Sequence, residues 1–450
     1  MSGAPWVLAA LLAAAAAPPA GGTPTAEVEV PGALLAGAVV LHPDRSGRGV
    51  VALLVRTGDG PDGECSRDLY LVDPLAPPGS AAAGPELVAR DLPAGTRIVP
   101  DARPDGSPAG PPHLLAARVG RAEILDPSAP DGLAPTLALP LPRRAERTAR
   151  GLRLESPAVQ AVPGHGSLLC LATEPEAHGR QRLRVLLSCS GQEEPEEVWA
   201  LLPGAETVTE SRYLRLGGVP VLAVLTRTKL GPFVVQDLRV FALAGSRTRA
   251  GEPPLLAART GCPLCRSSEL AAADADGDGR DDLVLLCQKG LIDRELRVVV
   301  FRNIAAPGEP PRFERRSRAV TVEGEHDAWW YGADLTGDGL PDLLSLRDGR
   351  FLELRAGSRG RRPVEGRPAW SVPAAAPEEP GEEGDEHRVE VRAGSDGGGV
   401  RVTRGGRRIL GVADLDGDGA REVLLYRPVR KRQGEETVWR GGAVSVLPLP

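Results

Sequence analysis

The sequence predicts an all-β protein built from repeated hairpins, and three observations lead to that prediction. Apolar runs of strand length recur along the 450 residues and are separated by turn residues, since the chain holds 55 glycines and 44 prolines. Three segments share one acidic pattern, and each runs directly into an apolar strand. The pattern returns at intervals that suit a repeat architecture better than one simple core.

The acidic pattern reads DADGDGRDDLVLL at residues 274–286, DLTGDGLPDLLSL at 334–346 and DLDGDGAREVLLY at 414–426. Oxygen-bearing side chains fall at positions 1, 3, 5 and 9 of each segment, and glycines fall at positions 4 and 6. The segments begin at Asp274, Asp334 and Asp414, so the first interval is 60 residues and the second is 80. We attribute the longer interval to an insertion rich in proline and glutamate near residues 378–386.

Weaker versions of the same unit extend the repeat into the N-terminal half. Loops of small or polar residues lead into apolar runs at residues 42–55, 104–117, 164–172 and 213–225. A second strand follows each of the seven loops, at residues 69–73, 121–125, 183–188, 238–242, 296–301, 351–354 and 443–447. Seven such units predict a seven-bladed β-propeller of four-stranded blades that spans residues 27–450 as a single domain. The alternative is two or three smaller β-sandwiches.

A propeller ring also needs a strand that closes it. The last unit ends at Leu449 after only three recognisable strands, and residues 26–30 (AEVEV) offer a spare alternating segment. We expect these two ends of the chain to pair, because pairing would complete the last blade and remove its open edge.

The three acidic segments resemble FG-GAP repeats, also called VCBS repeats, which form the propeller of the integrin α-subunit and occur in many exported bacterial proteins. The strict motif covers these three segments alone, and the first half of the chain follows the family by period. The resemblance implies that each acidic loop joins the first two strands of a blade and holds calcium. It implies three sets of ligands, namely Asp274, Asp276, Asp278 and Asp282; Asp334, Thr336, Asp338 and Asp342; and Asp414, Asp416, Asp418 and Glu422.

Carboxylates that converge on a tight loop favour a cation, because two of them 4 Å apart repel by roughly 4 kcal/mol at an effective dielectric constant near 20. Calcium accepts about six to eight oxygen ligands in flexible geometry, so a backbone carbonyl at position 7 would complement the side chains. That position is occupied by Arg280, Leu340 and Ala420. An EF-hand is excluded, because position 12 is leucine or serine and the flanking segments are β-rich. The other interpretation is that DGDG forms a plain hairpin turn.

The N-terminus predicts export. Residues 6–17 form an apolar run that is followed by a small-residue and proline-rich stretch, so we place a signal peptide at about residues 1–26. The run is too short to span a bilayer, and no later segment resembles a transmembrane anchor. We therefore expect a secreted, periplasmic or cell-surface protein. The formal charge of −6 and the lack of a clustered basic face argue against a nucleic-acid partner.

The chain contains 6 cysteines, an even number in an apparent export product, so disulfides are permitted. Cys170 and Cys189 lie in consecutive predicted strands of one hairpin, and we predict that they form a disulfide. Cys262 and Cys265 have the spacing of a redox or zinc motif. Because no βαβ pattern and no second pair follow them, structural disulfides or free thiols are favoured there.

The sequence lacks the zinc-protease helix motif, the Gly-x-Ser-x-Gly elbow, the phosphate loop and the dinucleotide fingerprint. We therefore predict a binding or adhesion module and not an enzyme, with an unknown protein or glycan ligand at one face of the propeller. The alternative is an exported polysaccharide lyase or hydrolase built on the same scaffold, since fold alone does not set function.

Two further segments carry expectations. In residues 328–334 (AWWYGAD), strand alternation would point Trp329 and Tyr331 to one side and Trp330 to the other. These rings serve either core packing between blades or, for one of them, a ligand platform. Residues 374–388 hold the acidic insertion, which we predict to be a mobile surface loop where proteolysis begins.

Overall fold

The structure is a computed structural model, and it describes residues 26–41, 49–57, 66–77, 80, 84–92, 96–99, 113–118, 121–127, 134–140, 160–162, 167–175, 181–189, 196–202, 207–230, 233–243, 254–261, 267–289, 295–360, 362–374, 388–391, 400–403, 408–415, 421–433 and 436–449. The predicted signal peptide lies outside these ranges apart from Ala26. The acidic insertion lies outside them apart from Ala374 and Arg388.

All regular elements of the described residues are β-strands, and the strands form seven four-stranded antiparallel sheets and one two-stranded sheet. The first three four-stranded sheets follow the order of the chain. They comprise β2 (Ala33–Leu41), β3 (Gly49–Thr57), β4 (Ser66–Val72) and β5 (Glu86–Ala89); β6 (Arg97–Val99), β7 (His113–Arg118), β8 (Arg121–Asp126) and β9 (Ala134–Pro140); and β10 (Gln160–Val162), β11 (Ser167–Pro175), β12 (Gln181–Cys189) and β13 (Glu196–Leu202).

The next three sheets continue in the same manner. They comprise β14 (Thr207–Leu216), β15 (Val219–Leu230), β16 (Phe233–Ala242) and β17 (Leu256–Arg259); β18 (Ser267–Ala273), β19 (Asp282–Lys289), β20 (Glu295–Phe301) and β21 (Arg318–Val322); and β22 (His326–Tyr331), β23 (Leu343–Arg347), β24 (Phe351–Arg355) and β25 (Trp370–Pro373). The hairpin predicted in each unit therefore forms the second and third strands of a sheet.

The last four-stranded sheet combines both ends of the chain. It contains β28 (Arg408–Ala413), β29 (Glu422–Gln433), β30 (Glu436–Pro448) and β1 (Ala26–Pro31). The strand β1 runs antiparallel to β30, with Ala26 opposite Val446. Pairing of the spare N-terminal segment with the last unit is thus confirmed. In addition, the backbone N–H of Leu34 donates a hydrogen bond to the hydroxyl oxygen of Tyr426 at 3.4 Å, which ties the first sheet to the last.

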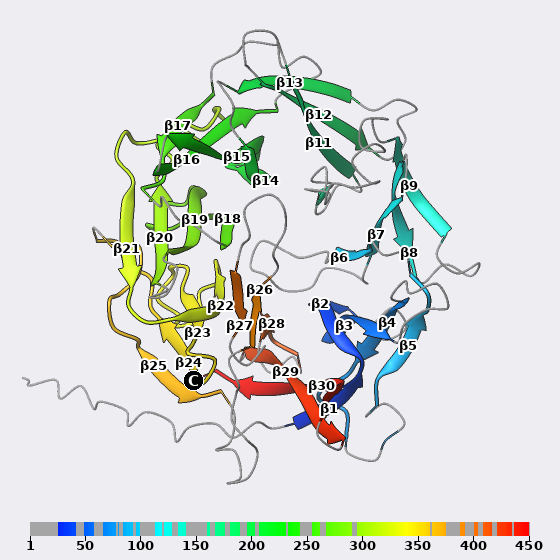
Figure 1. The fold of residues 1–450 in the computed structure, drawn as a ribbon. Coiled ribbons are helices and arrows are strands. Elements are labelled where there is room, and N and C mark those ends of the chain that lie inside the picture. The colour runs from blue at the N-terminus through cyan, green and yellow to red at the C-terminus, as the bar shows by residue number, and fades with distance from the viewer. Residues whose placement is uncertain are drawn as a thin grey trace, which may run out of the picture.

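The sheets surround a common centre, as in a β-propeller, and the first strand of most sheets lies nearest that centre (Figure 1). The apolar core lies in the layers between neighbouring sheets. One layer joins Leu225 of the fourth sheet to Leu285 of the fifth, and another joins Leu346 of the sixth to Leu425 of the last. Because β19 is covered on both faces, its first seven residues are all buried, which explains the unbroken apolar run after the acidic motif.

The two-stranded sheet lies between the sixth and last four-stranded sheets in the sequence. It pairs β26 (Arg388–Val391) with β27 (Val400–Thr403). The prediction assigned the longer repeat interval to the acidic insertion alone, whereas the structure places a complete extra hairpin in the same interval. No sequence pattern marked this hairpin, because its strands are only four residues long (RVEV and VRVT).

The aromatic segment of β22 alternates as predicted. Trp329 and Tyr331 pack into the core layer against the fifth sheet, while Trp330 packs into the layer against the last sheet. All three side chains are partly buried, so the core-packing interpretation holds for this strand.

Candidate metal site

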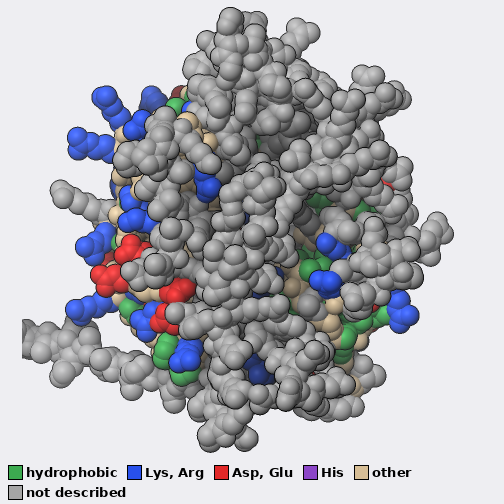
Figure 2. Space-filling view, in the orientation of Figure 1, with side chains coloured by type: hydrophobic (Ala, Val, Ile, Leu, Met, Phe, Trp, Pro, Cys, Tyr) green, Lys and Arg blue, Asp and Glu red, His purple; other side chains and the backbone are tan. Residues whose placement is uncertain are grey.

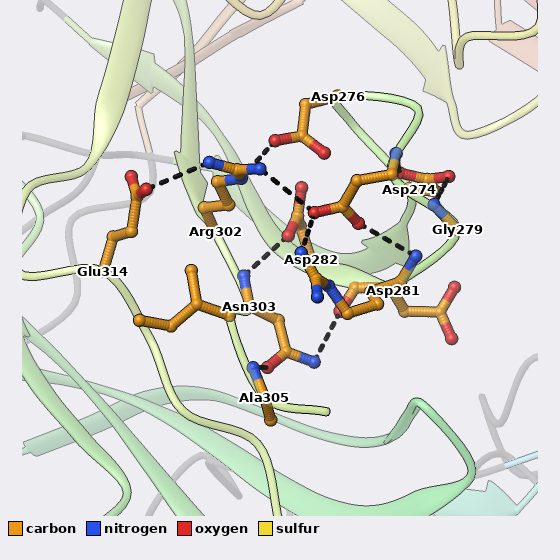
Figure 3. A network of polar contacts seen from close by, with 12 residues as sticks. Asp274, Asp276, Gly279, Asp281, Asp282, Arg302, Asn303, Ala305 and Glu314 are labelled. Carbon is orange, nitrogen blue, oxygen red and sulfur yellow. Dashed lines mark hydrogen bonds and ion pairs between the residues drawn. The ribbon is translucent and has the colours of Figure 1, made fainter. Parts of the chain in front are cut away.

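The first acidic loop connects β18 to β19 and brings three of its predicted ligands together. One carboxylate oxygen from each of Asp274, Asp276 and Asp278 lies within 4.8 Å of the others, so the three side chains could hold a metal ion. Figure 3 labels Asp274 and Asp276 of this group. The three residues occupy positions 1, 3 and 5 of the motif. Alternate positions of a tight turn can converge because the backbone curls around them.

The backbone of this loop is organised by the same carboxylates. Asp274 accepts hydrogen bonds from the backbone N–H groups of Asp278 at 2.9 Å and Gly279 at 2.7 Å. The N–H of Arg280 donates to Asp278 at 3.1 Å. Gly277 and Gly279 have φ angles of 73° and 83°, a region that residues with a Cβ rarely adopt. The glycines at positions 4 and 6 therefore supply the turn geometry of this loop.

Asp282, at position 9, is not among the three carboxylates that converge. Its side chain is buried, and its Oδ1 accepts a hydrogen bond from the backbone N–H of Asn303 at 2.7 Å. Burial raises the pKa of Asp282 to about 7, although the hydrogen bond from Asn303 acts to lower it. This residue therefore fastens the loop to the chain that follows β20, which the sequence motif alone did not indicate.

Arginine side chains contact the first loop from outside the motif. Arg302 forms ion pairs with Asp276 and with Asp278, the latter at 3.1 Å, and reaches Glu314 at 3.1 Å on its other side (Figure 3). Arg318 approaches Asp276 at 3.7 Å. Burial acts to raise the pKa of Asp278, but hydrogen bonds from Arg280 and Arg302 hold it below its usual value.

These arginines were missed by sequence reasoning. Arg302 follows β20 and Arg318 begins β21, so both lie outside the acidic motif and no local pattern marks them. Arg280, predicted to contribute its backbone carbonyl to a cation, also contacts Asp278 through its side chain, and this side-chain contact was not predicted. In the space-filling view, acidic side chains gather on the left of the molecule among Lys and Arg side chains (Figure 2).

A cation would fit the first loop because a carboxylate oxygen of Asp276 lacks a hydrogen-bond partner among the described residues. The side chain of Asp276 is 7% exposed, and its Oδ1 is buried without a hydrogen-bond partner among the described residues. Burial, and next the charge of Asp278, raise the pKa of Asp276. An oxygen-rich loop with a buried, unpaired carboxylate oxygen suits a hard cation with oxygen preference.

The second acidic loop connects β22 to β23 and is closed mainly by backbone hydrogen bonds. Asp334 accepts from the N–H groups of Gly337 at 2.7 Å and Gly339 at 2.9 Å. Asp338 accepts from Leu340 at 2.8 Å. Gly337 and Gly339 repeat the positive φ angles of the first loop, at 78° and 81°. The two loops therefore share one backbone design.

Asp342 is the position 9 carboxylate of this second loop. Its Oδ2 accepts hydrogen bonds from the backbone N–H groups of Leu335 and Thr336, each at 2.7 Å. The Thr336 hydroxyl lies 3.4 Å from Asp342 Oδ1. Position 3 of the second loop is Thr336, which carries a hydroxyl where the first loop has the carboxylate of Asp276. The second loop therefore offers fewer carboxylates to a cation than the first.

The third acidic loop connects β28 to β29 and is described in part. Leu415 donates its backbone N–H to Glu422 Oε2 at 2.8 Å, which matches the Leu335–Asp342 contact of the second loop. Asp414 is described as well. The predicted ligands Asp416, Asp418 and Ala420 lie outside the described residues.

The prediction of a disulfide between Cys170 and Cys189 is wrong, because the register of β11 and β12 does not place the two cysteines opposite each other. Cys170 lies opposite Leu186, and Cys189 lies opposite Ser167. The cysteines are thus three positions apart along the ladder, which separates their Cα atoms by about 10 Å at about 3.4 Å per residue. A disulfide needs about 7 Å or less. The hairpin itself was predicted, but its register differs from the one a Cys170–Cys189 disulfide requires.

A different cysteine takes part in a disulfide. Cys287 in β19 is fully buried and disulfide-bonded, and the side chains of the other five cysteines are outside the described part of the structure.

A second polar cluster joins the first strands of three neighbouring sheets. Ser268 donates a hydrogen bond to Glu210 at 2.5 Å, and the indole N–H of Trp329 donates to Glu269 at 3.0 Å. Arg212 lies 3.6 Å from Glu269. Burial raises the pKa of Glu210 to about 7, against the lowering effect of the Ser268 hydrogen bond. No sequence motif pointed to this cluster.

No helix in the described part of the chain has the length and apolar character needed to cross a membrane. No protein-family model matches the sequence, and no curated protein matches it.

Several solved structures resemble the fold over most of the chain. The β-propeller domain of Cps50 (Swd1) from Myceliophteria thermophila has 10% identity and a TM-score of 0.40, covering 94% of this chain and 98% of that chain. Polysaccharide lyase Uly1 has 10% identity and a TM-score of 0.43, covering 94% and 91%. Drosophila Plexin A, solved in complex with Semaphorin 1b, has 10% identity and a TM-score of 0.39, covering 96% and 88%. These likenesses are too distant to carry a functional argument.

Proposed function

We propose that this chain is an exported, seven-bladed β-propeller of FG-GAP/VCBS type that binds calcium in its acidic loops and serves as a binding or adhesion module. The observation that carries the proposal is the convergence of Asp274, Asp276 and Asp278 together with the unpaired, buried Oδ1 of Asp276. Loops of this geometry are stabilised by a cation, and calcium suits flexible oxygen coordination.

In this proposal the cation fixes the rim of the sheets, and a protein or glycan ligand meets one face of the propeller. Calcium would add positive charge among converging carboxylates. The protein's own residues hold the loops in place. Asp274 orders the loop backbone through hydrogen bonds, and Asp282 and Asp342 accept hydrogen bonds from the chain that follows the third strand of each sheet. The disulfide at Cys287 supports export.

Calcium binding is tested first by thermal melting of the full-length secreted protein with calcium and with chelator. Extracellular modules bind calcium with dissociation constants of about 0.1 to 1 mM. At roughly 1 mM free calcium, each site would then contribute about 0.4 to 1.4 kcal/mol, and three independent sites about 1 to 4 kcal/mol. A melting temperature that calcium leaves unchanged would identify the DGDG loops as plain turns.

The module function is tested by screening the same protein against glycans and cell-surface extracts, with calcium and with chelator. We expect calcium-dependent binding without consumption of the ligand. A loop variant, Asp276→Asn, should lose calcium-dependent binding, whereas Asp348→Asn, at a partly exposed turn outside the acidic loops, should retain it. Retained binding in Asp276→Asn, or binding unaffected by chelator, would contradict a role for the loops.

The second candidate function is a polysaccharide-active enzyme, and the cluster around Glu210 favours it. A carboxyl group with a pKa near 7 can donate a proton at neutral pH, as a general acid does in glycoside cleavage. Glu269 and Trp329 lie on the adjacent first strands. Release of sugar products in the glycan screen, abolished in Glu210→Gln, would replace the binding-module proposal with this one.

A further inference from the structure

We propose that Arg302 acts as an internal cation of the first acidic loop and lowers that loop's affinity for calcium by competing for the same carboxylates. The inference rests on the proposed calcium binding and concerns the regulation of one site. It would make the three acidic loops unequal, although their motifs are nearly the same.

The register of the sheets identifies the residues that correspond to Arg302. Leu283 lies opposite Phe301, Leu343 opposite Arg355, and Val423 opposite Leu447. The residues that come next along the chain are Arg302 in the first case, Ala356 in the second and Pro448 in the third.

Hydrogen bonds confirm this correspondence for the first two loops. The N–H of Asn303 donates to Asp282 at 2.7 Å, and the N–H of Gly357 donates to Asp342 at 2.7 Å. A guanidinium is therefore present beside the first loop at a position where the second loop has only a methyl group.

The contacts of Arg302 show that it pairs with two of the carboxylates a metal would use. Its guanidinium bridges Asp276 and Asp278, which are two of the three converging carboxylates (Figure 3). Glu314 holds the other side of the guanidinium at 3.1 Å, so the side chain is anchored in this orientation. The carboxylates of the second loop receive hydrogen bonds from the backbone and from Thr336, with no ion pair to Lys or Arg among the described residues.

The first loop also differs in how it closes. In the second and third loops, the backbone N–H at position 2 donates to the carboxylate at position 9, from Leu335 and Leu415 respectively. In the first loop, the corresponding oxygen, Asp282 Oδ2, is buried without a hydrogen-bond partner among the described residues. The loop that holds the guanidinium is thus the one that lacks this closing contact.

Competition follows from these contacts, because calcium and a guanidinium cannot both occupy the space between Asp276 and Asp278. A site whose competent form is only partly populated binds its ligand more weakly by that fraction. Removing Arg302 would leave the loop carboxylates without this counter-charge, so the metal-free protein should become less stable and calcium should bind more tightly.

The experiment isolates the first loop in the full chain by adding Asp338→Asn and Asp418→Asn, which weaken the other two loops. In this background, calcium affinity is measured by isothermal titration calorimetry for Arg302→Ala, Arg302→Lys and the control Arg312→Ala. Arg312 lies in the same connection between β20 and β21 but is exposed and contacts the carbonyl of Ile304 at 3.4 Å. We expect Arg302→Ala to tighten calcium binding at least about tenfold, Arg302→Lys to tighten it less, and Arg312→Ala to leave it unchanged.

A reciprocal variant keeps the test independent of how well Arg302→Ala folds. Ala356→Arg, in the chain with Asp276→Asn and Asp418→Asn, should weaken calcium binding at the second loop by a similar factor. Equal affinity in Arg302→Ala and its parent, or in Ala356→Arg and its parent, would overturn the inference while leaving calcium binding intact. Absence of calcium binding in the unsubstituted protein and in every variant would overturn the proposed function, and the inference with it.

Discussion

The carboxylate of Asp342 accepts a hydrogen bond from the backbone N–H of Gly357 at 2.7 Å, across the space between the acidic loop and the end of β24. Gly357 can come this close because it lacks a Cβ, which would lie 2.6 Å from the Cβ of Leu340 and 2.8 Å from the carbonyl oxygen of Pro341. The same link joins Asp282 to Asn303 in the preceding sheet. The carboxylate at position 9 is therefore a candidate ligand and also holds the loop against the following chain by a hydrogen bond.

Asp342→Asn should destabilise the protein even in the absence of calcium. The buried carboxylate accepts three backbone N–H groups, and an amide would present an N–H₂ group to some of those donors. Because hydrogen bonds to charged groups contribute about 1.5 to 3 kcal/mol, we expect a loss of about 2 to 4 kcal/mol. Urea denaturation in chelator measures it. Asp348→Asn, at a partly exposed residue that pairs with Arg347 at 3.7 Å, is the control, and an equal loss in both variants would show that Asp342 has no special role.

Thr336→Asp should have opposite effects with and without calcium. The new carboxylate would lie near Asp342, which the Thr336 side chain contacts at 3.4 Å, so repulsion should lower stability in chelator. With calcium, a fourth carboxylate should raise the affinity of the second loop by about tenfold. Melting curves and calorimetry in the two conditions check both signs. Thr336→Asn, which places a neutral amide where Thr336→Asp places a carboxylate, is the control and should show neither effect strongly.

Cys287 should be recovered as a disulfide-linked peptide when the protein is unfolded and digested without reductant. The bond constrains the unfolded chain, so reduction should lower the free energy of unfolding by about 2 to 4 kcal/mol. Mass spectrometry of the unreduced digest identifies the partner, and Cys287→Ser should show a loss similar to that on reduction. Alkylation of Cys287 in the unfolded, unreduced protein would contradict the prediction. Cys170 should not be found linked to Cys189.

His326 should make the protein less stable as the pH falls. Burial lowers its pKa from 6.5 to about 4, despite the hydrogen bond with the Glu323 carbonyl. A group whose folded-state pKa is depressed contributes stability above its unfolded pKa of 6.5, and loses it as the pH falls toward 4. At about 1.4 kcal/mol per pKa unit, the loss amounts to up to about 3 kcal/mol. His326→Gln should show a flatter stability profile in this window, as measured by denaturation at a series of pH values.

Glu210 should make the protein less stable as the pH rises, which is the opposite of the effect of His326. Burial raises its pKa from 4.5 to about 7, so its contribution to stability is present below pH 4.5 and is lost as the pH rises through 7. Glu210→Gln should therefore be more stable than the parent at pH 8, by about 1 to 2 kcal/mol after discounting for solvent screening at this partly exposed residue. Glu295→Gln, in an exposed ion pair with Lys289, is the control. A parent and variant that are equally stable at pH 8 would show that Glu210 is not held in its protonated form.

The sequence by itself determined the repeat and its local geometry. Each of the seven hairpins was predicted because a strand buried between two sheets must be apolar throughout, and β19 illustrates that pattern. The alternation of Trp329 and Trp330 follows from the two-residue period of a strand. The glycines at positions 4 and 6 of the acidic motif follow from the positive φ angles of the turn.

Only the tertiary structure decided which residues meet across strands. Arg302 reaches Asp276 because β20 returns beside the loop, and nothing near either residue in the sequence marks that contact. Likewise, a shift of register in one hairpin was enough to separate Cys170 from Cys189. Local sequence patterns reflect turn conformations and side-chain burial, which depend on a few neighbouring residues. The register between strands and the reach of a long side chain depend instead on how the whole sheet is assembled.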